Sequence, residues 1–129
     1  MYQAEDYIQL IPARDVDGLI INNRWRIGED VRVTKDGEPV FTVPADFSTD
    51  LASVPRMFWL ITGGKTGAHQ RAAVCHDYQC FVREISSNEA AQMFLDIMNQ
   101  DGVSYWRAKM MYWAVRYGGP NFDAKSNRK

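Results

Sequence analysis

The sequence predicts an α+β fold, in which a small antiparallel sheet over about residues 19–43 packs against a three-helix unit over about 68–117. The chain of 129 residues changes character near residue 65. Before that point β-branched residues, prolines and turn residues dominate, whereas helix formers dominate after it. A length of this order favours one domain. We expect a strand-rich half at 1–64, a helical half at 65–118 and a flexible tail at 119–129.

Two hairpins are predicted in the sheet. The arms of VRVTKDGEPVFTV are rich in strand formers and flank Asp36-Gly37, a dipeptide typical of tight hairpin turns. Upstream, LIINNRWRI contains two short apolar runs around Asn22-Asn23, which indicates a second hairpin. Three or four antiparallel strands follow from this pattern.

The segment between the sheet and the helices is expected to be irregular. Pro55 is placed to begin a single helical turn that ends near Leu60. The following ITGGKTG is rich in glycine, but no glycine lies five positions before Gly64. The spacing of a phosphate-binding loop is therefore absent.

The first two helices are expected over about 68–83 and from Ser86 or Ser87 to near Gly102. Glu89 stands at the capping-box distance from Ser86, which marks the start of the second helix. Its expected core stripe follows helical spacing and consists of Ala90, Phe94, Ile97 and Met98.

The third helix is expected over about 104–117, ending at Gly118-Gly119-Pro120. Rows of aromatic residues and methionine at helical spacing are usually core, and this helix has one such row: Trp106, Met110, Trp113 and Tyr117.

A second stripe on the third helix interleaves cations with tyrosines. Such a stripe can hold a phosphate or stack a base, and it can equally be an ordinary amphipathic edge. The formal net charge of −1 makes nucleic acid an unlikely partner for the whole chain. The candidate ligand-binding residues are Tyr105, Lys109, Tyr112 and Arg116.

His76 and Asp77 stand side by side in the first helix, within RAAVCHDYQC. At about 100° per residue, His76 lies opposite the predicted core face and among small residues, which leaves room for another group to approach. A histidine-aspartate pair on a helix is also typical of a structural hydrogen-bond node. The predicted core face consists of Val74, Cys75, Tyr78, Phe81, Val82 and Ile85.

DFSTDLASVPR supplies the remaining candidate catalytic residues. We expect Asp50 to orient or activate His76, as carboxylates do for catalytic or metal-bound imidazoles. Asp77 and Arg56 would stabilise charge, and Ser53 would act as a nucleophile or a hydrogen-bond donor. The simpler alternative is that the polar residues of this loop satisfy its own backbone.

A divalent metal site is the weaker hypothesis, and no cofactor is predicted. His76 and Cys80 share a helix face, but the sequence contains no HExxH, paired CxxC or EF-hand pattern. Cys75 and Cys80 would point apart on one helix, so we expect no disulfide between them.

Four segments together resemble a small domain family of tailed bacteriophages and prophages that has no settled activity. They are FTVPADFSTDLASVPR, RAAVCHDY, SNEAAQMFLDIMNQDGV and RAKMMYWAVRYGG, and the resemblance covers about residues 25–118. It implies a phage-encoded protein. The chain departs from the pattern at Cys75 and Cys80, where apolar residues are typical, which argues against a cysteine ligand or nucleophile. Matching the pattern picks out Thr49, Asp50, Ser53, Pro55, Arg56, His76 and Asp77.

Three functions are compatible with these features. The first is a small hydrolase of a cell-wall bond or a phosphodiester, with a site at Asp50, His76 and Asp77. The second is a non-enzymatic virion component or assembly factor of the tail or neck, and the third is a binder that sequesters a host nucleotide signal. Partners would be other phage proteins or a host target, with self-association left open. We expect no signal peptide and no membrane span, which favours the host cytoplasm or the virion.

Overall fold

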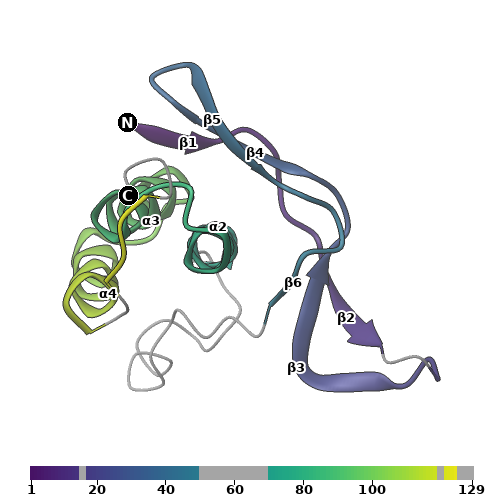
Figure 1. Ribbon diagram of the computed structural model, residues 1–129. Coiled ribbons are helices and arrows are strands. Elements are labelled where there is room, and N and C mark those ends of the chain that lie inside the picture. Colours follow the sequence, from purple (N-terminus) through teal and green to yellow (C-terminus); the bar gives the residue numbers. More distant parts are fainter. Residues whose placement is uncertain (15–16, 50–69, 119–120, 125–129) are drawn as a thin grey trace.

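The α+β prediction is confirmed by the computed structural model, which describes residues 1–14, 17–49, 70–118 and 121–124. The strands form two small antiparallel sheets of three strands each, and three helices follow them in the described part of the chain (Figure 1). No helix within these residues is long and apolar enough to cross a membrane.

The first sheet has the order β1-β4-β5, where the strands are β1 (Tyr2–Ala4), β4 (Val31–Lys35) and β5 (Glu38–Val43). The predicted hairpin between β4 and β5 is confirmed. Asp36 and Gly37 form its turn with φ values of 52° and 87°. Both values are left-handed, which is why an Asp-Gly pair suits this turn.

The second sheet has the order β2-β3-β6, where the strands are β2 (Leu10–Arg14), β3 (Ile20–Ile27) and β6 (Ser48–Thr49). The hairpin predicted around Asn22-Asn23 is wrong, because β3 runs without a break through both residues. Pairing with β2 near each end of β3 holds it extended and overrides a weak local turn signal.

The three helices are α2 (Gln70–Val82), α3 (Ser87–Gln100) and α4 (Tyr105–Gly118). The predicted start of α3 is confirmed. Ser86 is the N-cap, and its Oγ accepts a hydrogen bond of 3.2 Å from the backbone N–H of Glu89. The helical turn expected near Pro55 and the glycine-rich 61–67 lie outside the described residues.

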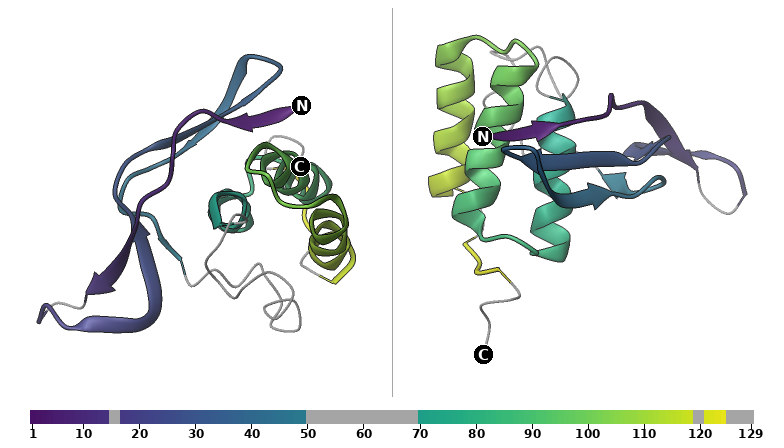
Figure 2. Two further views of the ribbon diagram at one scale, coloured as in Figure 1. Left: turned by 180° about the vertical axis from the view of Figure 1, so that it is seen from behind. Right: turned by 90° about the horizontal axis from the view of Figure 1, so that it is seen from above.

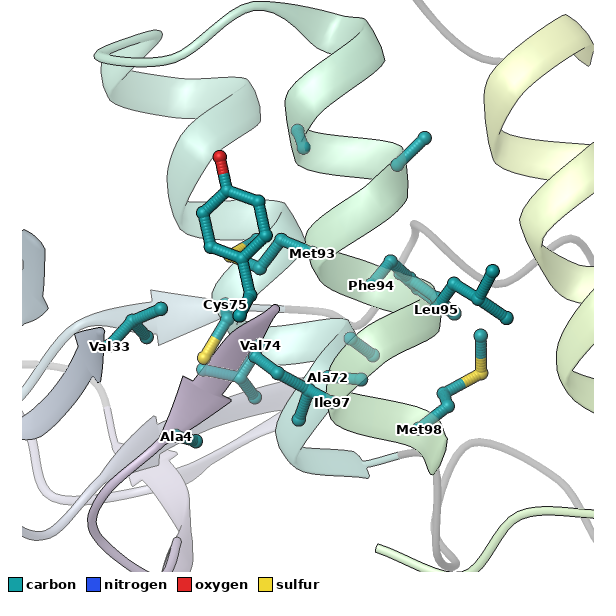
Figure 3. Close-up of a cluster of buried hydrophobic side chains, with 14 of the residues drawn as sticks. Ala4, Val33, Ala72, Val74, Cys75, Met93, Phe94, Leu95, Ile97 and Met98 are labelled. Carbon is teal, nitrogen blue, oxygen red and sulfur yellow. The ribbon is translucent and has the colours of Figure 1, made fainter. Parts of the chain in front are cut away.

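The core is built around α3, which lies between α2 and α4 and beneath β1 (Figure 1). The predicted apolar stripe of α3 is confirmed, and burial extends beyond it to most of the helix circumference. Figure 3 shows α3 side chains packed against those of α2 and the first sheet. The buried residues of α3 are Ala90, Ala91, Met93, Phe94, Leu95, Asp96, Ile97 and Met98.

Two polar side chains of α3 hold β1 in place. The carboxylate of Asp96 accepts a 3.0 Å hydrogen bond from the backbone N–H of Tyr2. The amide of Gln100 accepts from the N–H of Ala4 and donates to its carbonyl, both at 2.9 Å. These contacts satisfy polar groups of β1 that do not pair with β4.

The core stripe predicted for the third helix is wrong. Ala108, Met111 and Val115 are the buried residues of α4, whereas Trp106 is 70% exposed and Tyr117 is 75% exposed. The small side chain of Ala108 lets α4 lie close to α3, so the bulky aromatic row faces outward instead.

Part of the segment expected to be a flexible tail packs against α3. Phe122 is buried, its N–H donates to Ser87 Oγ at 3.1 Å, and its carbonyl accepts from the Ser87 N–H at 2.9 Å. Residues 121–124 therefore close one side of the α3 N-terminus.

Arg71 links α2 to two other parts of the chain. Its side chain is 8% exposed, and its guanidinium binds the carboxylate of Asp101, the C-cap of α3, through Nη2 and through Nε at 3.1 Å. Its Nη1 also donates to the carbonyl of Asp6 at 2.7 Å, in the connection that follows β1. The ion pair therefore fixes α2 against α3 and the N-terminal segment.

Replacing Arg71 with methionine should lower the free energy of unfolding by about 3–5 kcal/mol, because it leaves a largely buried carboxylate without its counter-ion. Arg71→Lys should lower the free energy of unfolding by less than Arg71→Met does. It keeps the positive charge, but an ammonium group cannot make the forked contact with the carboxylate. Urea unfolding at pH 7 measures both variants. Arg32→Met, which breaks an exposed ion pair with Asp6, is the matched control and should have a much smaller effect. Equal losses in Arg71→Met and Arg32→Met would contradict the role assigned to the buried pair.

Candidate functional site

The candidate site begins where β6 meets α2. Thr49, the last residue of β6, is buried and pairs with Trp25 of β3. Its Oγ1 donates a short hydrogen bond to the carboxylate of Asp77 on α2. This bond joins the second sheet to the helix that carries the predicted histidine-aspartate pair.

His76 is buried rather than open to solvent. The residue is 4% exposed, and its ring meets the ring of Phe94 edge-on, with 5.3 Å between the centroids. The Nδ1 atom lies 3.6 Å from Cys80 Sγ, one turn further along α2. The room that the helical wheel indicated beside His76 is therefore filled, because α3 covers that side of α2.

Burial sets the protonation state of His76. Loss of hydration lowers the pKa of the imidazole to about 4. The ring is therefore neutral at physiological pH, and burial makes it a weaker proton acceptor than an exposed imidazole.

The core face predicted for the first helix is only partly right. Val74 and Cys75 are buried, but Phe81 is 77% exposed. Tyr78 is half-buried, with its ring stacked on Phe41 at 5.9 Å and edge-on to Phe47 at 5.2 Å. The N-terminal half of α2 is buried on all its sides, which a prediction based on one apolar face does not anticipate.

The cysteines are free, as expected, and neither is activated. Burial raises the pKa of the Cys75 thiol to about 12 and that of Cys80 to about 11, so both are protonated at neutral pH. No group of three or more His, Cys, Asp or Glu side chains in the described residues could hold a metal ion. The contact between His76 and Cys80 therefore does not amount to a metal site by itself.

Three of the predicted catalytic residues, Asp50, Ser53 and Arg56, lie outside the described residues. The expected contact between Asp50 and His76 stays a prediction. Of the predicted catalytic residues within the described part, His76 and Asp77 are consecutive on α2, with Asp77 bonded to Thr49.

The predicted ligand-binding stripe of α4 does come together on one side of the helix. Lys109 Nζ lies 5.8 Å from the ring centroid of Tyr105 and 5.9 Å from that of Tyr112. Tyr112 also packs against the core, and Arg116 lies over the ring of Tyr117 at 5.0 Å. The cations of this stripe are thus already engaged with aromatic rings of the same helix.

Sequence reasoning missed two residues of the site. Helical spacing predicts Phe94 only as a core residue of α3, and the packing of α2 on α3 brings its ring to His76. The resemblance picks out Thr49 without implying a role for it. Its position directly before Asp50 is the available signal.

Comparison with known proteins gives a family but no activity. A family model described as "Protein of unknown function (DUF1353)" matches residues 25–115. An uncharacterized protein, y4jT, from Sinorhizobium fredii (strain NBRC 101917 / NGR234) is 35% identical over 111 residues, covering 73% of this chain and 33% of that protein. The chain thus spans about a third of the length of this relative. No solved structure matches the chain.

Stability should depend on pH through His76. The folded-state pKa of about 4 lies below the 6.5 of an exposed imidazole, so the unfolded chain binds this proton more readily. The free energy of unfolding therefore falls as pH drops from 6.5 towards 4. From this group alone we expect it to be about 2 kcal/mol smaller at pH 5 than at pH 7.5.

Urea unfolding of the wild-type protein and His76→Asn at both pH values measures this contribution. Other titrating groups are shared by the two proteins, so they cancel in the difference. The same pH dependence in both proteins would show that His76 is not buried in its neutral form.

Proposed function

The chain belongs to the DUF1353 family of proteins of unknown function, and we propose that it is a hydrolase with a catalytic site around His76 and Asp77. The observation that carries the proposal is the hydrogen bond from Thr49 to Asp77. It joins the end of β6 to α2 beside a buried, neutral imidazole. Asp50 follows Thr49 directly in the sequence, which supports the expected approach of Asp50 to α2.

His76 is the general base of the proposed reaction. With a pKa of about 4, the imidazole is unprotonated at neutral pH but is a weak base. A carboxylate beside the ring would offset this weakness by stabilising the imidazolium as the ring takes a proton from a water molecule that attacks the substrate. The imidazolium formed is a strong acid in this environment, so it readily passes the proton to the leaving group. Because the ring is so little exposed, a single water fits this role better than direct contact with a large substrate.

In the proposed reaction, the carboxylates of Asp50 and Asp77 orient His76 and stabilise the positive charge that develops on its imidazole. Asp77 is kept in one orientation by Thr49, and Asp50 is the residue that we expect to orient the ring of His76. Arg56 would stabilise negative charge on the substrate, and Ser53 would donate a hydrogen bond or act as the nucleophile. The bond broken is a cell-wall bond or a phosphodiester.

Two substrates separate these alternatives, and the same assays test the proposal. Dye-labelled peptidoglycan reports cleavage of cell-wall bonds, and bis(4-nitrophenyl) phosphate reports cleavage of a phosphodiester. We expect one of them to be hydrolysed, and His76→Asn to lower the rate by about 10²–10⁴-fold because it removes the base. Phe81→Ala, at an exposed aromatic residue of the same helix, is the control and should be fully active.

Thr49 is a positioning residue in this scheme, so its test needs a rescue. Thr49→Val removes the hydroxyl and should lower the rate, while Thr49→Ser keeps the hydroxyl and should restore it. Urea unfolding shows whether each variant is folded. No hydrolysis of either substrate by the wild-type protein, or full activity in folded His76→Asn, would end the proposal.

The loop and helix motifs resemble those of a phage and prophage family, and a phage origin would favour a second candidate function. This is a non-enzymatic virion component or assembly factor. The observation that favours it is the β2–β3 hairpin, which extends away from the three helices (Figure 2). An arm of this kind can reach a neighbouring subunit. Mass spectrometry of purified particles should find the protein at integral stoichiometry, and its absence from particles would remove this candidate.

A further inference from the structure

The outer side of α4 is an aromatic surface that stays largely exposed in the described part of the chain. Trp106, Met110, Trp113 and Tyr117 fall within an arc of about 60° on the helix, and we call them the aromatic face of α4. Trp106 is 70%, Trp113 52% and Tyr117 75% exposed. This face lies opposite the buried side of the helix, which packs on α3. Exposed apolar patches of this kind usually mark an interaction site.

The charged residues of α4 itself are all positive. Arg107, Lys109 and Arg116 belong to α4, and the helix contains no Asp or Glu. Lys109 and Arg116 lie beside the aromatic face on one flank, about 70–90° from its centre on the helical wheel. The surface that covers the aromatic face must therefore be apolar at its centre and anionic at its edge.

We propose that the aromatic face of α4 docks on the surface of an anionic lipid bilayer. Tryptophan and tyrosine favour the interface between headgroups and acyl chains, and the row of four side chains extends about 16 Å along the helix. Lys109 and Arg116 then reach the headgroup phosphates from the flank. At 14 residues, α4 is too short to span the bilayer and lies along its surface.

Charge argues against two other occupants. A second copy of the chain would bring the cations of two α4 helices together with no carboxylate on either helix to balance them. A nucleic acid longer than the helix would also lie against the rest of the chain. That part is net negative, because α4 supplies three cations and the whole chain has a net charge of −1, so it would repel the phosphates. A flat bilayer meets only the outer face.

Sedimentation with lipid vesicles tests the proposal. We expect the protein to bind vesicles that contain phosphatidylglycerol, to bind pure phosphatidylcholine much less, and to be released by salt. The double variant Trp106→Ala/Trp113→Ala should lose at least about tenfold in vesicle affinity, and Lys109→Glu/Arg116→Glu should lose the preference for anionic lipid. Phe81→Ala is the matched control, because it removes an exposed aromatic residue of α2 and should bind as the wild type does.

The location of the contact is read from tryptophan fluorescence. Brominated lipids should quench the wild-type emission and should quench Trp106→Ala/Trp113→Ala much less. Absence of vesicle binding, or unchanged binding in this double variant, would overturn the proposal. The proposal would also be overturned if the protein did not bind vesicles but used these tryptophans to bind another partner. The partners to test are a single-stranded oligonucleotide, an acidic protein and a second copy of the chain. His76→Asn should bind vesicles normally, which separates this result from the fate of the hydrolase proposal.

Discussion

The burial of α3 on most of its sides is the constraint on which the rest of the structure depends. A helix that is apolar around most of its circumference has to be covered from several directions at once. In this protein β1, α2 and α4 each supply part of the cover. Each large side chain removed from water contributes about 1.5–3 kcal/mol, so the Met93, Phe94, Ile97 and Met98 side chains of α3 account for a large share of the driving force.

The chemistry at His76 follows from this packing. Small residues of α2, including Ala72 and Ala73, are fully buried, so α2 can lie close to α3 and the imidazole comes to rest against Phe94. Arg71 fixes the beginning of α2 against Asp101, and the bond from Thr49 fixes its middle at Asp77. These two anchors leave α2 little freedom to rotate. The neutral state of His76 is thus a property of how two helices meet.

The sequence predicted features that depend on neighbours along the chain. The Asp36-Gly37 turn and the Ser86 cap were correct because the residues involved lie within a few positions of one another. The sequence did not show features that depend on distant partners, such as the clamp of Gln100 on Ala4 or the contact of Thr49 with Asp77. For α4, periodicity predicts the row of large aromatic residues and methionine as the core. Close approach to α3 instead favours a third stripe of small and medium side chains, Ala108, Met111 and Val115, which neither predicted stripe contains.

The two candidate functional regions, the aromatic face of α4 and the site around His76, differ in their relation to stability. The aromatic side chains of this face of α4, Trp106, Trp113 and Tyr117, are exposed, so they contribute little to folding. Exposed tryptophans in a row need another explanation than the core. A function at this face can therefore be lost while the fold stays intact. His76 is the opposite case, because the burial that lowers its pKa also makes its ring part of the core. Selection on the proposed chemistry and selection on stability act there on the same contacts, whereas at α4 they act on different sides of one helix.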